Sequence, residues 1–122
     1  MVPHAGDTYF LPRVVPFHQL MELSMLSETV TSERIAQTGV INRLVPGEAV
    51  MPTARELARR LAEGPTRSLG LTKRMYRNSL HRDMESVFED ERTASALVST
   101  TADRVEGVRA LVEQRPPSFT GR

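Results

Sequence analysis

Apolar side chains recur at helical spacing along most of this chain. Between residues 17 and 26, the residues Phe17, Leu20, Met21 and Met25 fall on one face of a helix with 3.6 residues per turn. Similar apolar stripes run through residues 54–62, about 66–80, 84–98 and 105–112. The pattern therefore predicts a mainly helical protein.

Capping and helix-breaking residues divide these stripes into separate helices. Asp7 or Thr8 can cap a short helix that begins at Tyr9, and Thr53 and Glu56 have the spacing of a capping box. Further predicted caps and stops are Thr31 or Ser32, Gly39, Gly64-Pro65, Asp83, Thr101 and Arg115-Pro116-Pro117. We therefore expect short helices in the first forty residues and longer ones after residue 53.

One segment has the pattern of a β-strand instead. Residues 40–45 are short and rich in β-branched side chains, and Pro46-Gly47 follows them directly. A single strand cannot leave its backbone N–H and C=O groups unpaired in a core. We therefore expect this strand to pair with another chain, a second copy, or a missing part of the protein.

Composition excludes several classes of function. The chain has 122 residues, of which 39% are apolar, no cysteine, and a net charge of +1 from 16 basic and 15 acidic side chains. Disulfides, thiolate metal sites and a cysteine nucleophile are excluded, and so balanced a charge does not favour nucleic acid or an anionic membrane. No apolar run approaches the length of a membrane span, and no secretory signal pattern opens the chain. The expected location is the cytoplasm.

Three groups of residues follow one another in a recognisable order. The first fits the pattern Pro-x-Ala-Gly-Gly-Thr and Leu-x-Arg with Pro3, Ala5, Gly6, Thr8, Leu11 and Arg13, and Asp7 replaces the second glycine. The second is Gly39-Val40-Ile41-Asn42, and the third comprises Asp103-Arg104-Val105-Glu106-Gly107 and Arg115-Pro116-Pro117-Ser118-Phe119. In this order and spacing they resemble the C-terminal half of the enoyl-CoA hydratase/isomerase (crotonase) family.

The resemblance implies a fold and a division of the chain. The expected fold class is mainly α with one short strand, forming the C-terminal helical, trimerising region of an α/β crotonase-like β-β-α fold. Residues 1–45 are expected to be the end of the crotonase-like core, with two helices, a short helix and the strand. Residues 46–122 are expected to be a C-terminal helical oligomerisation region.

The resemblance also implies a chemistry whose central groups cannot be assigned here. Family members polarise the carbonyl of a CoA thioester with two backbone N–H groups, because negative charge develops on that oxygen. These donors and the family's two glutamates precede the Pro-x-Ala-Gly motif, so no catalytic residue is carried over to this chain. We expect the catalytic groups in a missing N-terminal half and expect the isolated chain to be inactive.

Four residues match binding positions of the family. His4 and Ala5 correspond to residues that line the active site, and His4 departs from the usual glycine there. A histidine can bind water or accept a proton near neutral pH, or it can simply be an exposed loop residue. Gln114 and Ser95 correspond to CoA-contacting positions, where the family often has a lysine and an aromatic residue respectively. Both are changed here, and a neutral glutamine binds a phosphate less strongly than a cation does.

The resemblance further implies the partners of the protein. The expected substrate is an acyl-CoA thioester, and no cofactor is expected beyond the CoA that the substrate carries. No metal site is expected either, because His18 and His81 lack ligands at suitable spacing. A homo-oligomer, trimeric or hexameric, or pairing with an N-terminal half is expected, without nucleic-acid or membrane partners.

Three interpretations of the chain are weighed. The chain is the C-terminal portion of an enoyl-CoA hydratase/isomerase-like enzyme, a catalytically inactive helical oligomerisation module, or a nucleic-acid binder. The basic stretch from Arg67 to Arg82 can contact phosphates or form a solvated helix face. A nucleic-acid binder is the least favoured hypothesis, because only Tyr76 lies among these cations as a stacking residue.

Overall fold

The computed structural model describes residues 2–122, and every regular element in that range is helical. The elements are α1 (Asp7–Phe10), η1 (Leu11–Arg13), α2 (Phe17–Leu26), α3 (Ser32–Gln37), η2 (Gly47–Ala49), α4 (Val50–Ala62), α5 (Thr66–Ser79), α6 (Met84–Ser99) and α7 (Ala102–Val112). They form two compact units, one ending at Val50 and the other running from Met51 to Arg122. The functional division predicted after residue 45 stays a prediction.

The predicted strand at residues 40–45 is wrong. These residues form an irregular connection between α3 and η2, and no strand occurs anywhere in residues 2–122. Their β-branched composition suits a strand, but a strand exists only when a second extended segment offers hydrogen bonds. The described chain offers none, so the segment stays irregular.

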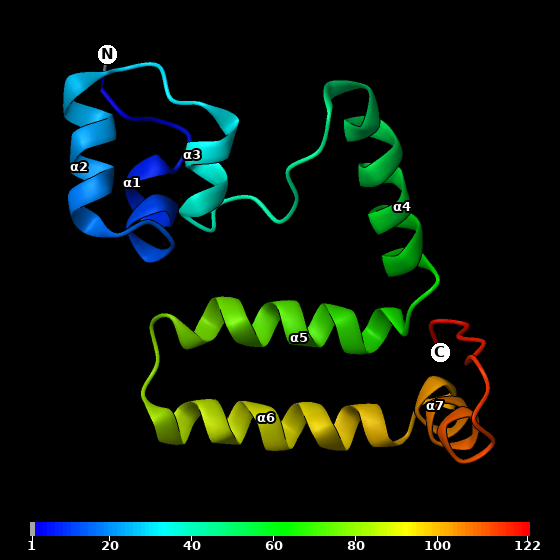
Figure 1. The fold of residues 1–122 in the computed structure, drawn as a ribbon. Coiled ribbons are helices and arrows are strands. Elements are labelled where there is room, and N and C mark those ends of the chain that lie inside the picture. Colours follow the sequence, from blue (N-terminus) through cyan, green and yellow to red (C-terminus); the bar gives the residue numbers. More distant parts are fainter. Residues whose placement is uncertain (1) are drawn as a thin grey trace. The chain divides into compact units, whose positions relative to one another are not determined.

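The N-terminal unit contains α1, η1, α2, α3 and η2, and Figure 1 labels its three α-helices. Helix α2 has the predicted limits and buries Leu20, and Val15, just before the helix, is buried as well. The predicted cap of α1 is wrong, because Asp7 lies inside the helix and Gly6 is its N-cap. Gly39 ends the α3 region with a φ of 81°, the left-handed conformation that favours glycine.

The C-terminal unit is built around a helical hairpin. Helices α5 and α6 run antiparallel to one another, and α7 follows across the end of α6 (Figure 1). Asp83 caps α6 by accepting the Ser86 N–H at 2.8 Å, and Thr101 caps α7 by accepting the Arg104 N–H at 3.1 Å. Both N-terminal boundaries therefore agree with the sequence pattern.

Helix α4 begins earlier than its capping-box pattern predicts. It starts at Val50 directly after η2, so Thr53 lies within the first turns and does not cap the helix. Pro52 fits this position because the first turn of a helix has N–H groups without intrahelical partners. The early start replaces the predicted capping box.

Very little apolar surface is buried in residues 2–122. The buried apolar residues are Val15, Leu20, Ala94 and Ala110. Val112 on α7 is 78% exposed, although it belongs to an apolar stripe of the sequence, and its neighbour Leu111 is 78% exposed as well. No helix among the described residues has both the length and the apolar character needed to cross a membrane.

Candidate functional site

One hollow lies in the N-terminal unit, between the loop before α1, α1 itself and α2. Its volume is about 650 Å³. Phe17, Leu20, Met21 and Met25 line it from α2, the same residues that the sequence pattern assigns to a helical core stripe. Only Leu20 is buried, whereas Phe17 and Met25 are 63% and 71% exposed. The stripe therefore forms the wall of an open, mostly apolar trough.

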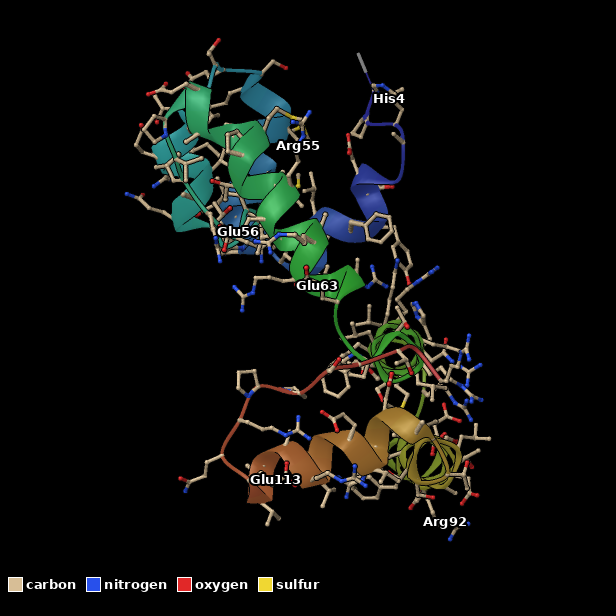
Figure 2. All side chains as sticks on the ribbon, turned by 90° about the vertical axis from the view of Figure 1, so that its right-hand side faces the viewer. His4, Arg55, Glu56, Glu63, Arg92 and Glu113 are labelled. Carbon is tan, nitrogen blue, oxygen red and sulfur yellow. The ribbon has the colours of Figure 1, made fainter. Side chains whose placement is uncertain are left out.

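The opposite wall of this trough carries its polar groups. His4, Asp7 and Thr8 line it beside Leu11. Figure 2 shows His4 on the loop that precedes α1. An imidazole and a carboxylate at the edge of an apolar trough can hydrogen-bond the polar end of a ligand whose apolar part occupies the trough.

A tight turn places His4 at the trough. The Asp7 N–H donates to the His4 carbonyl oxygen at 3.1 Å, and the two residues between them, Ala5 and Gly6, have φ values of 56° and 91°. The φ of Gly6 favours glycine, and a Cβ there would also crowd the Phe10 ring at 3.1 Å. The sequence of this turn thus determines where His4 lies.

The other predicted site residues lie at separate places. Ala5 is exposed in the turn and does not line the trough. Ser95 is exposed on α6, and Gln114 is exposed in the turn that follows α7. The structure brings His4 and Ala5 into one turn, while Ser95 and Gln114 belong to the C-terminal unit.

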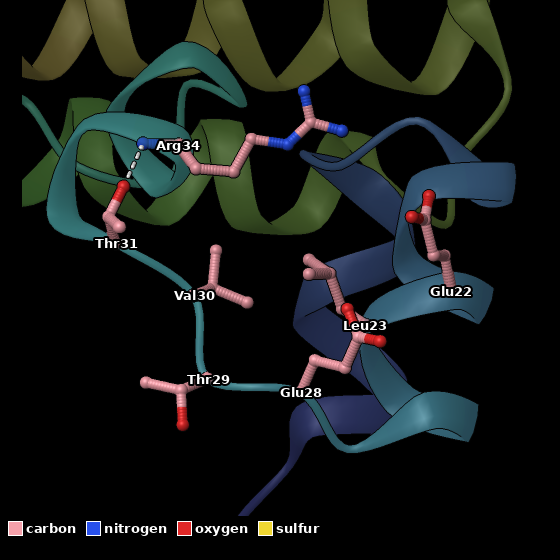
Figure 3. Close-up of a pocket in the computed structure, with 7 residues that line it drawn as sticks. All are labelled: Glu22, Leu23, Glu28, Thr29, Val30, Thr31 and Arg34. Atoms are coloured by element: carbon pink, nitrogen blue, oxygen red, sulfur yellow. Dashed lines mark hydrogen bonds between the residues drawn. The ribbon is translucent and has the colours of Figure 1, made fainter.

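A smaller, more polar hollow of about 220 Å³ lies between α2 and the start of α3 (Figure 3). Its carboxylates are those of Glu22 and Glu28, and Arg34 extends over it from α3. The Arg34 N–H donates to Thr31 Oγ1 at 3.3 Å, which caps α3. None of the residues 2–122 forms a cluster of three or more histidine, aspartate or glutamate side chains arranged to hold a metal ion.

Two carboxylates on α7 hold the tail that follows it. Asp103 is buried, and its carboxylate accepts the Thr120 N–H at 2.7 Å and the Gly121 N–H at 2.9 Å. Its own N–H donates to the Arg122 carbonyl oxygen at 2.9 Å. The tail therefore runs back along α7. Sequence reasoning did not find this role, because the partners are 17 to 19 residues apart in the chain.

Glu106 forms the second attachment of the tail. It accepts both terminal guanidinium nitrogens of Arg115, at 2.6 and 3.0 Å, and the Ser118 N–H at 2.9 Å. The hydrogen bonds from Arg115, followed by that from Ser118, lower the pKa of Glu106 to about 2. The hydrogen bond from Arg115 to Glu106 and that to Glu113 raise the pKa of Arg115.

Comparison with known proteins identifies the family. The sequence pattern described as Enoyl-CoA hydratase/isomerase matches residues 1–122, the whole chain. The chain belongs to the enoyl-CoA hydratase/isomerase family. This membership confirms the resemblance found in the sequence, and its ordered motifs are part of a match that covers the whole chain.

Individual members of the enoyl-CoA hydratase/isomerase family share both sequence and fold with this chain. The 1,2-epoxyphenylacetyl-CoA isomerase of Escherichia coli is 34% identical over 100% of this chain and 47% of its own length. A probable enoyl-CoA hydratase of Rhodobacter capsulatus is 32% identical over 100% of this chain and 48% of its own length. A solved enoyl-CoA hydratase subunit of Geobacillus kaustophilus has a TM-score of 0.91 at 29% identity, covering 100% of this chain and 48% of that one. This chain spans about half the length of the curated relatives that it matches.

Proposed function

We propose that this chain is the C-terminal portion of an enoyl-CoA hydratase/isomerase-type enzyme that acts on acyl-CoA thioesters. The observation that carries the proposal is the family match over all 122 residues, together with a fold like that of solved enoyl-CoA hydratases. The trough beside His4 supports it, because its apolar wall suits an acyl group and its polar edge suits the thioester end.

The proposal assigns the acid–base and oxyanion groups to residues outside this chain. The trough has one carboxylate, that of Asp7, whereas hydration in this family uses two glutamates. His4 remains the residue here that can bind water or move a proton near the substrate. No cofactor is required in this proposal, since CoA arrives on the substrate.

A chimeric enzyme tests the proposal. The N-terminal half of the Escherichia coli relative is joined to this chain, and the matched control is the intact relative. We expect the chimera to bind acyl-CoA and to turn over a thioester, while the chain alone leaves crotonyl-CoA unchanged in an absorbance assay. Turnover by the chain alone would show that the catalytic groups lie within it. A folded chimera that binds no acyl-CoA would refute the proposed role.

Oligomerisation without catalysis is the second candidate function. The observation that favours it is the apolar surface of α7, where Val105 and Val108 are 55% and 42% exposed and Leu111 is 78% exposed. Surfaces of this kind mark contact with another protein, and we propose a trimer or hexamer, or pairing with an N-terminal half. Light scattering after size exclusion tests this second proposal, with the chain alone and mixed with the N-terminal half of the Escherichia coli relative. A stable monomer that does not bind this half would contradict the proposal. We also propose that the protein is located in the cytoplasm, which cell fractionation tests.

A further inference from the structure

One face of α5 carries four cationic side chains and no carboxylate. Arg67, Lys73, Arg74 and Arg77 are all exposed, and the sequence of α5 contains neither aspartate nor glutamate. At 100° per residue, the four fall within about 120° of the helix circumference. They cover a length of about 15 Å along the helix axis, at 1.5 Å per residue. We call these four residues the α5 basic face.

The cations of this face have no acidic partners within residues 2–122, unlike several other arginines of the chain. Arg59, Arg82, Arg92 and Arg115 each pair with a carboxylate. None of the four residues of the α5 basic face does so. Like charges three and four residues apart destabilise a helix. The α5 basic face therefore carries an electrostatic penalty that an anionic partner would remove.

One acidic residue of α6 shares a hollow with this face but is already engaged. Arg74 and Asp90 line the same hollow, of about 280 Å³, between α5 and α6. However, Asp90 accepts a hydrogen bond from Arg82 at 2.9 Å. Within the hairpin, the negative charge of Asp90 therefore pairs with Arg82, and Arg74 has no acidic partner among residues 2–122.

Gly70 lies in the middle of the α5 basic face. Glycine within a helix is unfavourable compared with alanine, so it usually meets a packing need. Here a Cβ on Gly70 would meet nothing within 4 Å, so the packing of this chain does not require the glycine. Two hollows, of about 440 and 310 Å³, meet at Gly70 and share Arg74. The missing side chain leaves room for the backbone of another molecule to approach α5 closely.

We propose that the α5 basic face docks an acidic helix of a partner protein, with its backbone crossing α5 at Gly70. Arg67 and Arg74 are seven residues apart, so carboxylates one heptad apart on a facing helix have the matching spacing of about 10 Å. Arginine forms bidentate hydrogen bonds with carboxylates, which suits three of the four cations. Small residues at a crossing point let two helix backbones approach.

The same observations disfavour other occupants. Tyr76, the one aromatic residue of α5, lies about 60° around the helix from Lys73, outside the α5 basic face, and a single ring beside the face gives successive bases no stacking platform. A second copy of this chain is also disfavoured. On the exposed side of α6, Glu85 is followed one heptad later by Arg92, which would repel the α5 basic face.

A designed peptide tests the proposal directly. The probe is a helical, alanine-rich peptide of about 21 residues with glutamates one heptad apart, and its control has the same composition in scrambled order. Binding to the full chain is measured by fluorescence anisotropy at low and at physiological salt. We expect the heptad peptide to bind more tightly than the scrambled one, and to weaken as salt rises.

Two variants separate charge from close approach. Arg67→Glu/Arg74→Glu is expected to weaken binding about tenfold or more, since two ion pairs become two repulsions. Gly70→Leu keeps every charge and raises helix propensity, so its expected severalfold loss of binding cannot come from unfolding of α5. Circular dichroism of each variant verifies the helix content. Arg55→Glu/Arg60→Glu on α4 makes the same change in net charge and is expected to bind like the parent chain.

Each contrary outcome overturns the proposal. If the scrambled peptide binds as tightly as the heptad peptide, the face is a nonspecific cationic surface. If Gly70→Leu binds as tightly as the parent, no backbone approaches at Gly70. Tighter binding of a short DNA duplex than of the peptide would assign the face to nucleic acid, and concentration-dependent dimers that Arg67→Glu/Arg74→Glu abolishes would assign it to a second copy.

Discussion

The loop before α1 and the tail after α7 both lie outside helices, yet different interactions fix their conformations. The loop is shaped by its own backbone, through two successive residues of positive φ and one hydrogen bond between residues 4 and 7. The tail is shaped by carboxylates on a helix, which accept hydrogen bonds from residues 115–121. A local sequence signal can therefore reveal the loop, whereas only the folded helix reveals what holds the tail. The loop lines the trough, and the tail supports α7.

Asp103→Ala should have the largest effect on the tail. Removing this buried carboxylate leaves the Thr120 and Gly121 N–H groups without their acceptors, and we expect a loss of about 3 kcal/mol in unfolding free energy. Asp103→Asn keeps the shape of the side chain and one acceptor oxygen, so the expected loss of unfolding free energy is about 1 kcal/mol. Urea denaturation followed by circular dichroism measures both, with exposed Glu91→Ala as the control. Equal stability of Asp103→Ala and Glu91→Ala would show that the tail contributes nothing.

Gly6→Ala tests the loop in the corresponding way. The substitution places a Cβ at a φ of 91° and 3.1 Å from the Phe10 ring, so we expect a loss of about 1–2 kcal/mol. Gly47→Ala is the matched control, because a Cβ there meets nothing within 4 Å and the residue has no positive φ. Thermal unfolding measures both variants. If the two alanine variants melt alike, the turn at Gly6 is not what holds His4 in place.

The tail also predicts a dependence of stability on pH. Since folding lowers the pKa of Glu106 from 4.5 to about 2, its ionised form favours the folded state. This stabilisation is fully present above pH 4.5 and is lost as the pH falls toward 2. Glu106→Gln should therefore be less stable than the parent chain above pH 5, and the difference should shrink steadily on acidification. A difference that stays constant from pH 6 to pH 2 would contradict the pKa shift.

The same contrast explains which parts of the fold the sequence could predict. Thr31, Asp83 and Thr101 were predictable at their helix starts because a capping side chain bonds a backbone N–H three residues away. Residues 40–45 were not, because a strand depends on a partner that no local pattern specifies. The tail anchors were missed for the same reason, since Asp103 and Thr120 are far apart in the chain.

The candidate site shows the same limit. The motif around Pro3 and Gly6 indicated the position of His4, because the turn is local. The apolar stripe containing Phe17 and Met25 was predicted as core, since periodicity shows that side chains share a face but not what covers that face. Only the structure shows that this face borders a trough.

Gln114→Gly should give the smallest change, and it separates the stability of the tail from its proposed contact with CoA. Gln114 has a φ of 52°; its N–H donates to the Leu111 carbonyl oxygen at 3.3 Å, and the Arg115 N–H donates to that of Ala110 at 3.0 Å. This is the Schellman arrangement, whose left-handed position favours glycine, so we expect a gain of about 0.5 kcal/mol. If the amide contacts CoA, the chimera carrying Gln114→Gly binds acyl-CoA more weakly although the chain is more stable. Asparagine tolerates the same backbone angle and keeps a shorter amide. The chimera carrying Gln114→Asn should therefore bind acyl-CoA with an affinity between those of the parent chimera and the glycine variant. Unchanged affinity in the glycine variant would leave Gln114 with a role in the helix end alone.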